Sequence, residues 1–155
     1  MITEHFNSAL KHLRIADHMA YMTYPLVNDK KILVKIFVEI YNSINEIILA
    51  TLFYEATKNK IKISENPYAN LQKFLDIAKN YNLTNKELQE ITDIIKQFYM
   101  HKKSAMEFIR EERVVILSDN LRTQSIDIQK VKEYICLTKV IIVKVKDKIL
   151  NKRSI

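Results

Sequence analysis

Residues 30–58 read KKILVKIFVEIYNSINEIILATLFYEATK, a pattern typical of a long helix. Apolar side chains recur at steps of three and four residues, and further apolar residues flank this stripe. A helix that is apolar over so wide an arc has to be covered on more than one side, so we expect it to be the central helix of a bundle. The stripe comprises Leu33, Phe37, Ile40, Ile44, Ile47 and Tyr54, and the strip left for water comprises Lys35, Glu39, Asn42 and Glu46.

The composition also favours helices. The 155 residues are 48% hydrophobic, which is ample for one core, and they include no glycine and two prolines. Tight hairpin turns and phosphate-binding loops depend on glycine for positive φ, so helices joined by short asparagine-containing connections are the natural architecture. We therefore expect an all-α, up-and-down bundle of about five helices that forms a single domain over residues 1–155.

Local signals give the helix boundaries. The first helix should run from Thr3 to Tyr24, because Pro25 disfavours helical geometry in the residue before it. Three later helices have start signals of their own: Asn66 followed by Pro67, the capping box of Thr84 and Glu87, and Asp127 ahead of the last helix.

The helical periodicity is interrupted between Met106 and Asp127. Ser104 and Glu107 repeat the capping-box pattern and predict a short helix through Arg110. Beyond it, two apolar runs flank Asp119-Asn120, which tolerate left-handed geometry. A short β-hairpin or an extended loop is therefore expected at about 113–126, and because the turn lacks glycine both alternatives stay open. This segment would either cover one end of the core or pair edge-to-edge with a second copy.

Basic side chains outnumber acidic ones, and the formal net charge is +7. Residues 81–155 carry 15 basic and 10 acidic side chains, a net of +5, whereas residues 1–80 carry 10 and 8, a net of +2. Clustered cations are what phosphate neutralisation requires, although such a balance also keeps an apolar bundle soluble. The candidate nucleic-acid contacts are Lys102, Lys103, Arg110, Arg113 and Arg122 at one junction, and Lys132, Lys139, Lys146 and Arg153 in a row along the last helix.

Three polar residues of the first helix are the only candidates for catalysis. Arg14 and His18 lie one turn apart, a pairing that can bind phosphate and move a proton. Asp17 interrupts the apolar stripe. It is either an acid–base group with a shifted pKa, a buried carboxylate that binds a basic partner, or a partly exposed residue at the rim of the bundle. The alternative for all three is ordinary helix surface.

No metal site, cofactor or membrane span is expected. His5 and His12 have no accompanying ligand spacing, and Cys136 lies among apolar neighbours in a helix. No uncharged apolar run is long enough to cross a bilayer, and no signal-peptide pattern is seen at the first residues. We expect a soluble, cytoplasmic protein.

The opening of the chain, an Ala- and Leu-spaced helix leading through a short loop into a long apolar one, resembles HEPN-type bundles. That resemblance implies an up-and-down helical bundle, frequent homodimerisation and, in active members, metal-independent RNA cleavage. Active members carry an Arg followed, after four to six residues, by a His. This sequence departs from that motif: Arg14 and His18 have three residues between them, and no His follows Arg110, Arg113 or Arg122.

Three functions follow from these features. The first is a non-catalytic interaction module that self-associates as a dimer or binds a protein partner. The second is RNA binding through the basic residues. The third is a divergent HEPN-like ribonuclease that uses Arg14 and His18.

Overall fold

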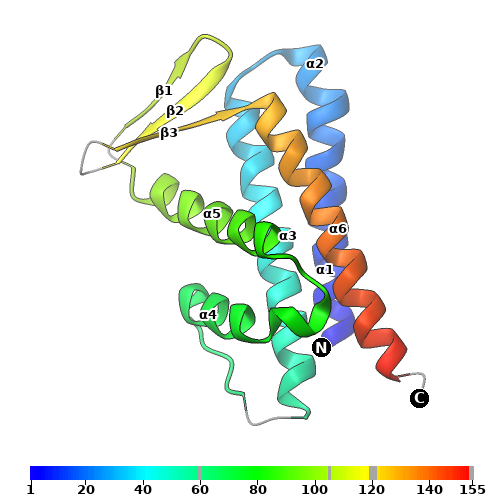
Figure 1. The fold of residues 1–155 in the computed structure, drawn as a ribbon. Helices are drawn as coiled ribbons and strands as arrows, with labels where there is room; N and C mark the ends of the chain where they lie inside the picture. The colour runs from blue at the N-terminus through cyan, green and yellow to red at the C-terminus, as the bar shows by residue number, and fades with distance from the viewer. Residues whose placement is uncertain (59–60, 105, 119–121, 154–155) are drawn as a thin grey trace.

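The computed structural model describes residues 1–58, 61–104, 106–118 and 122–153, with side chains as far as residue 150. Within these residues the chain is an all-α bundle with a small antiparallel sheet at one end, as Figure 1 shows. The helices are α1 (Ile2–His18), α2 (Tyr24–Val27), α3 (Lys31–Ala56), α4 (Pro67–Ile77), α5 (Asn85–Lys102) and α6 (Ile128–Arg153); a π-helical turn (Met19–Thr23) precedes α2 and a 3₁₀ turn (Ala78–Tyr81) follows α4.

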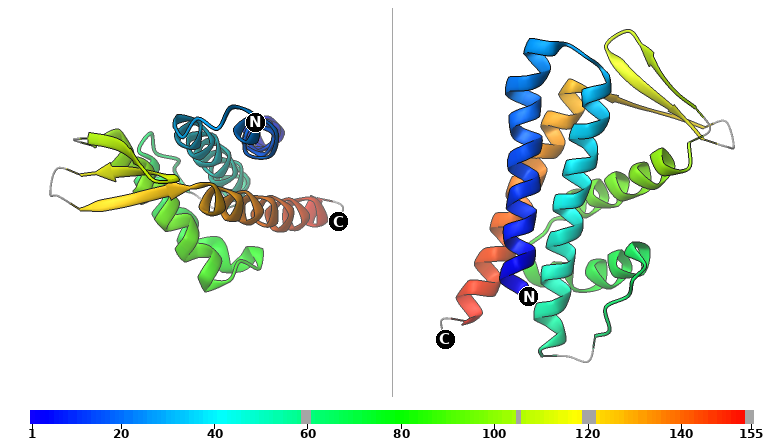
Figure 2. Two further views of the ribbon diagram at one scale, coloured as in Figure 1. Left: turned by 90° about the horizontal axis from the view of Figure 1, so that it is seen from above. Right: turned by 180° about the vertical axis from the view of Figure 1, so that it is seen from behind.

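Helix α3 is central, as its apolar pattern predicted. It packs against α1, α4, α5 and α6, and also contacts the sheet. The long helices α1, α3 and α6 lie side by side, whereas α4 and α5 cross α3 at an angle on its other side (Figures 1 and 2). Because these neighbours cover α3 from several sides, its buried residues span more than half of its circumference.

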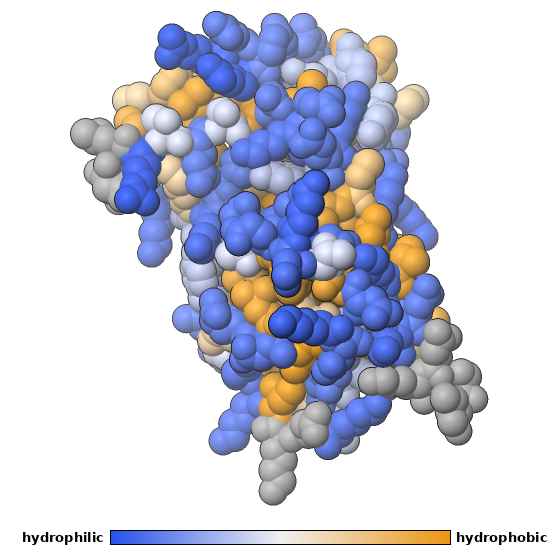
Figure 3. Space-filling model, in the orientation of Figure 1, coloured by the Kyte–Doolittle hydropathy of each residue, from blue (hydrophilic) through white to orange (hydrophobic). Residues whose placement is uncertain are grey.

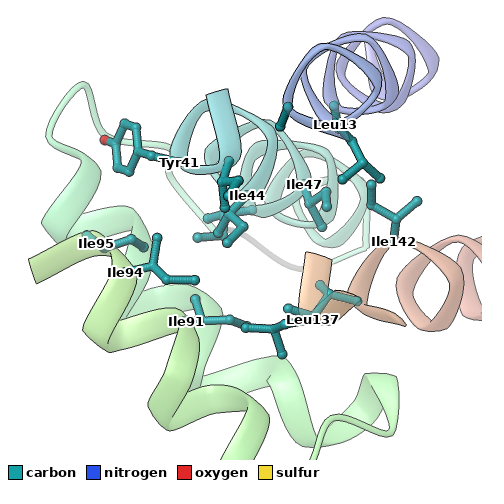
Figure 4. Packing of buried hydrophobic residues seen from close by; sticks show 14 of the residues in the cluster. Leu13, Tyr41, Ile44, Ile47, Ile91, Ile94, Ile95, Leu137 and Ile142 are labelled. Carbon is teal, nitrogen blue, oxygen red and sulfur yellow. The ribbon is translucent and has the colours of Figure 1, made fainter. Parts of the chain in front are cut away.

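The core is one connected cluster. Leu13 of α1, Ile44 and Ile47 of α3, Ile91 of α5 and Ile142 of α6 meet in its middle (Figure 4). All five side chains are at most 6% exposed. Buried polar groups are mostly paired: the Ser43 hydroxyl, for example, donates to the carbonyl of Ala9 on α1 at 2.7 Å.

The first helical segment continues past Pro25, which corrects the expected end at Tyr24. After α1 the chain widens into the π-helical turn and resumes as α2, with Pro25 in its first turn. Proline lacks an N–H and cannot close an ordinary helical bond, so a change of helical pitch accommodates it here. The segment ends at Asn28, whose φ of 52° is left-handed.

Asparagine and glutamate take the positions at which a chain normally uses glycine. Asn28 and Asn82 end helical segments, and Glu111 lies in a strand connection, all with positive φ. The expected helix starts are present: Asn66 accepts from Tyr68 N, Thr84 and Glu87 form a reciprocal capping box, and the Asp127 carboxylate accepts from Lys130 N.

Three strands form the sheet in the order β1-β2-β3, with both pairs antiparallel. They are β1 (Met106–Arg110), β2 (Arg113–Leu117) and β3 (Thr123–Asp127). The expected hairpin is β2-β3, and the extended-loop alternative is wrong. Asp119-Asn120, which we placed at its turn, lie outside the described residues. The short helix expected through Arg110 is also wrong, because residues 106–110 pair with β2 instead.

Candidate functional site at the sheet end

Strand β1 forms an outer edge of the sheet. All five of its residues are exposed, including Met106 at 56% and Ile109 at 49%. Its register pairs Arg110 with Arg113 across a two-residue turn. Such a turn closes on a hydrogen-bonded pair, and bonded pairs alternate along an antiparallel ladder. The backbone N–H and C=O groups of Glu107 and Ile109 therefore point away from β2, to an edge with which no other described strand pairs.

An apolar groove runs between this edge and the amino end of α3. Its volume is about 530 Å³, and its walls include Val34, Phe108, Ile109 and Val114. Seen from behind, the β1-β2 hairpin extends beside the first turns of α3 (Figure 2). Apolar side chains show between hydrophilic ones at the sheet end in Figure 3. The groove is rimmed by Lys31 and Lys35, which lie one helical turn apart.

One lysine anchors the β1-β2 turn to the helices. Lys30 Nζ lies 2.6 Å from the carboxylate of Glu112, in the turn, and donates to Asn28 Oδ1 at 2.8 Å. It also lies over the ring of Tyr24, 5.2 Å from the centroid. The hydrogen bond to Glu112 raises the pKa of Lys30. This contact links the turn to the residues just before α3.

The outer face of the sheet carries two arginines. Phe108 and Val115 lie opposite each other on that face, followed by the pair Arg110 and Arg113. A hollow of about 230 Å³ lies among these four side chains and residues 123–125. Within the described part of the chain, neither arginine forms an ion pair.

The structure divides the five basic residues predicted at this junction between the two ends of the sheet. Arg110 and Arg113 flank the turn between β1 and β2. Lys102, Lys103 and Arg122 lie at the opposite end, where β1 and β3 begin. A five-residue strand separates the groups by roughly 13 Å. The residues do not form one continuous cluster.

A second hollow, at the Lys103 end of the sheet, combines aromatic and basic side chains. Tyr68 of α4 and Tyr99 of α5 face each other with ring centroids 4.6 Å apart, and Lys96 and Lys103 lie beside them. The hollow measures about 540 Å³. Burial, followed by the nearby Tyr99, raises the pKa of Tyr68. This site was not singled out from the sequence, although Lys96, Tyr99 and Lys103 share one helical face.

The basic row along α6 is partly occupied by contacts within the chain. Lys139 Nζ lies 3.0 Å from the Asp17 carboxylate, and this hydrogen bond raises the pKa of Lys139. Lys132 lies over the ring of Tyr21 at 4.8 Å. Lys146 is exposed, whereas the side chain of Arg153 lies outside the described residues.

The three candidate catalytic residues lie on the surface of α1. Arg14 and His18 are exposed, and Asp17, 41% exposed, has its carboxylate directed to Lys139 of α6. Asp17 is thus at the rim, one of the alternatives its position left open. In the described structure neither Arg14 nor His18 forms a side-chain hydrogen bond or ion pair with another residue, and their role in catalysis stays a prediction.

Two histidines of α1 bind carboxylates of α3. His5 Nδ1 lies 2.5 Å from Glu46, and His12 Nδ1 lies 2.6 Å from Glu39. Glu39 and Glu46 are therefore half-buried partners of α1, which corrects their expected exposure to water. Across the described residues, no group of three or more His, Cys, Asp or Glu side chains is placed to hold a metal ion.

Among the described residues, no helix has the length and apolar character needed to cross a membrane. No protein-family model matches the chain. Comparison with curated proteins likewise finds no match. The resemblance to HEPN-type bundles therefore stays a prediction.

Proposed function

We propose that the chain is a cytoplasmic, non-catalytic interaction module that accepts a strand from a partner polypeptide at the open edge of β1. The observation that carries this proposal is the edge itself: every residue of β1 is exposed, and three of the five are apolar. Natural sheets usually protect such an edge with proline, a bulge or a covering element. Here the edge is left open beside an apolar groove.

Strand addition uses groups that are already in place. The outward backbone groups of Glu107 and Ile109 supply main-chain hydrogen bonds, and the groove receives alternate side chains of the incoming strand. The contact between Lys30 and Glu112 links the hairpin to the start of α3 before a partner arrives. The conformational freedom that this link removes is not lost again on binding, which favours affinity.

Two substitutions of one residue test the role of the edge. Ile109→Pro removes an outward N–H and leaves the bonds between β1 and β2 in place, since proline is tolerated on the free side of an edge strand. Ile109→Thr removes the same apolar side chain but keeps the N–H. Proteins that co-purify with the native chain should remain with the Thr variant and be lost with the Pro variant, while circular dichroism shows both variants folded. Equal retention by both folded variants would contradict strand addition.

RNA binding is a second proposal, and the hollow of Tyr68 and Tyr99 supports it. Aromatic rings that stack on bases, next to lysines that neutralise phosphates, are typical of single-strand recognition. Lys102 and Arg122 lie at the same end of the sheet and extend the basic surface.

A fluorescent single-stranded RNA titrated over a range of salt concentrations tests this second proposal. Affinity should fall as salt rises, and reversing Lys96 and Lys103 to Glu should flatten that dependence. Tyr99→Ala should weaken binding by about fivefold or more, whereas Tyr99→Phe keeps the stacking ring. A salt-independent interaction, or one indifferent to these residues, would remove RNA binding from consideration.

A further inference from the structure

The groove beside β1 is apolar along its floor and basic along its rim. Ile109 is half exposed there, and Val34 and Val114 line the groove with it. Among the described residues that line this groove, Glu107 is the one carboxylate, and it is hydrogen-bonded to the ring of His101. Lys31 and Lys35 are exposed, and neither forms an ion pair within the described residues. The rim is thus positively charged.

Lys31 lies in the first turn of α3, and Lys35 lies one turn further along. The amino end of a helix carries a partial positive charge, so a cation in the first turn is unfavourable there. The Asp29 carboxylate accepts from Lys31 N at 3.0 Å and meets part of that backbone charge, and the ammonium group of Lys30 is paired with Glu112. The ammonium groups of Lys31 and Lys35 form no ion pair within the described residues, and they lie beside an open strand edge. Charged groups placed at such an edge without a partner in the chain are candidates for function.

The spacing of the lysines suits a carboxylate on an added strand. Lys31 and Lys35 are about 6 Å apart along α3, from four residues of helical rise. Residues two apart on a strand lie on one face, about 6.8 Å apart. An added strand can therefore place one side chain over Val34 and Ile109. The side chain two positions along the strand, on the same face, then lies against one of the two lysines.

We propose that the groove binds an extended acidic segment of another protein, in which an apolar and an acidic residue, two positions apart, face the groove together. The apolar residue packs on Val34 and Ile109, and the carboxylate pairs with Lys31 or Lys35. This inference rests on the proposed strand addition at β1 and names the chemistry of the added strand. A second copy of this chain is disfavoured as the occupant, because each copy carries a formal net charge of +7 and the groove-facing carboxylate of its own β1, Glu107, is already bound to His101.

Short peptides of defined sequence test the inference. In the acidic peptide every second residue is threonine, and the residues between the threonines are valine and glutamate in turn. As a strand, this peptide carries threonine on one face and carries valine and glutamate, two positions apart, on the other. The basic peptide replaces glutamate with lysine. Titration of the ¹⁵N-labelled chain with the acidic peptide should shift the amides of Glu107 and Ile109 and those of residues 31–35. The basic peptide should bind at least about fivefold more weakly, from the worth of exposed ion pairs.

Charge reversal provides the matched control. With Lys31 and Lys35 both changed to Glu, the acidic peptide should lose about tenfold in affinity and the basic peptide should gain, because attraction is exchanged for repulsion. Lys11→Glu introduces the same kind of change on the exposed surface of α1 and should alter neither affinity.

The outcomes separate the inference from the proposed function. If both peptides shift the β1 amides with equal affinity, strand addition holds and the acidic specificity is refuted. If neither peptide shifts them at any concentration, the proposed function itself fails. If the β1 amides shift with the concentration of the chain alone, the occupant is a second copy and the inference is overturned.

Discussion

Replacing Glu87 by Gln should destabilise the protein at neutral pH and have little effect in acid. Glu87 lies at the start of α5, 12% exposed in its side chain, and its Oε1 has two donors. Thr84 N donates to it at 2.9 Å and closes the capping box, and Lys144 of α6 donates at 2.6 Å. The carboxylate thus joins the amino end of α5 to α6.

The magnitude follows from these contacts. A well-formed ion pair with limited exposure contributes up to about 1 kcal/mol, and a carboxylate at a helix amino end roughly a further 0.5 kcal/mol. Glutamine keeps an oxygen acceptor but loses the charge, so we expect a loss of about 1.5 kcal/mol in the free energy of unfolding. For a chain of 155 residues this corresponds to a fall in melting temperature of roughly 3–6 °C.

The pH dependence has a definite sign. Burial alone would raise the pKa of Glu87, but the hydrogen bonds from Lys144 and Thr84 outweigh burial, so the pKa lies below its ordinary value of 4.5. A lowered pKa contributes stability above the unfolded-state pKa, and that contribution is lost as pH falls through the folded-state pKa. The difference in the free energy of unfolding between the native chain and the Glu87→Gln variant should therefore disappear in acid.

Urea unfolding followed by circular dichroism between neutral and acidic pH measures this difference. Glu90→Gln, one turn along the same helix, removes a carboxylate that has no ion pair in the described structure and should change stability by less than about 0.5 kcal/mol. In a double-mutant cycle with Lys144→Met, the two losses should not add, because they remove the same contact. A difference that persists or widens in acid, or fully additive losses, would refute this reasoning.

Four further predictions concern stability and titration. Ile44→Ala should cost about 2–5 kcal/mol in urea unfolding, against less than about 0.5 kcal/mol for the exposed Val143→Ala; similar costs would contradict the packing described for α3. Glu111→Gly should increase the free energy of unfolding by about 0.5 kcal/mol, and so raise the melting temperature, because glycine adopts the left-handed φ of 56° without strain. A lower melting temperature would mean that the turn tolerates glutamate without strain. Ser43→Ala should cost about 1 kcal/mol through the lost buried hydrogen bond, and no loss would argue against that bond. Burial raises the pKa of Tyr134 to about 12, so Tyr134→Phe should leave the ultraviolet titration near pH 10 unchanged; a smaller absorbance step there would contradict that burial.

The fold was predictable where its signals are local. The apolar arc of α3 marks it as the centre whichever neighbours cover it, and Asn66, Thr84 and Asp127 begin helices through bonds to residues two or three positions away. Such contacts can be read from a few consecutive residues.

Two errors arose where distant residues compete with local preference. Ser104 and Glu107 fit a capping box, but Ser104 N donates to His101 O, and the Glu107 carboxylate contacts the Ser104 hydroxyl and the His101 ring. Residues 106–110 instead form strand β1, which pairs with β2 along its full length. That pairing depends on residues 113–117, so the local pattern alone could not reveal it. Glu39 and Glu46 were likewise assigned to water because their partners, His12 and His5, lie on another helix.

The candidate site was only partly predictable for the same reason. The sequence indicated that residues 106–127 interrupt the bundle, and that Arg110 and Arg113 are grouped there. Which strand would be left at the edge depends on the sheet order, and the groove depends on how the hairpin lies on α3. Neither is encoded in the spacing of charges along the chain.

The two bridges between α1 and α3 have a consequence for alignment errors during folding. His5 contacts Glu46 and His12 contacts Glu39. The two histidines are seven residues apart on α1 and the two glutamates seven apart on α3, in the reverse order because the helices are antiparallel. If α1 slid along α3 by a single turn, both bridges would break together, and only a slide of two turns would restore one of them. A misalignment by one turn therefore loses the energy of both contacts, whereas a misalignment by two turns loses only one. In this way two weak polar contacts favour a single position of α1 along the apolar surface of α3.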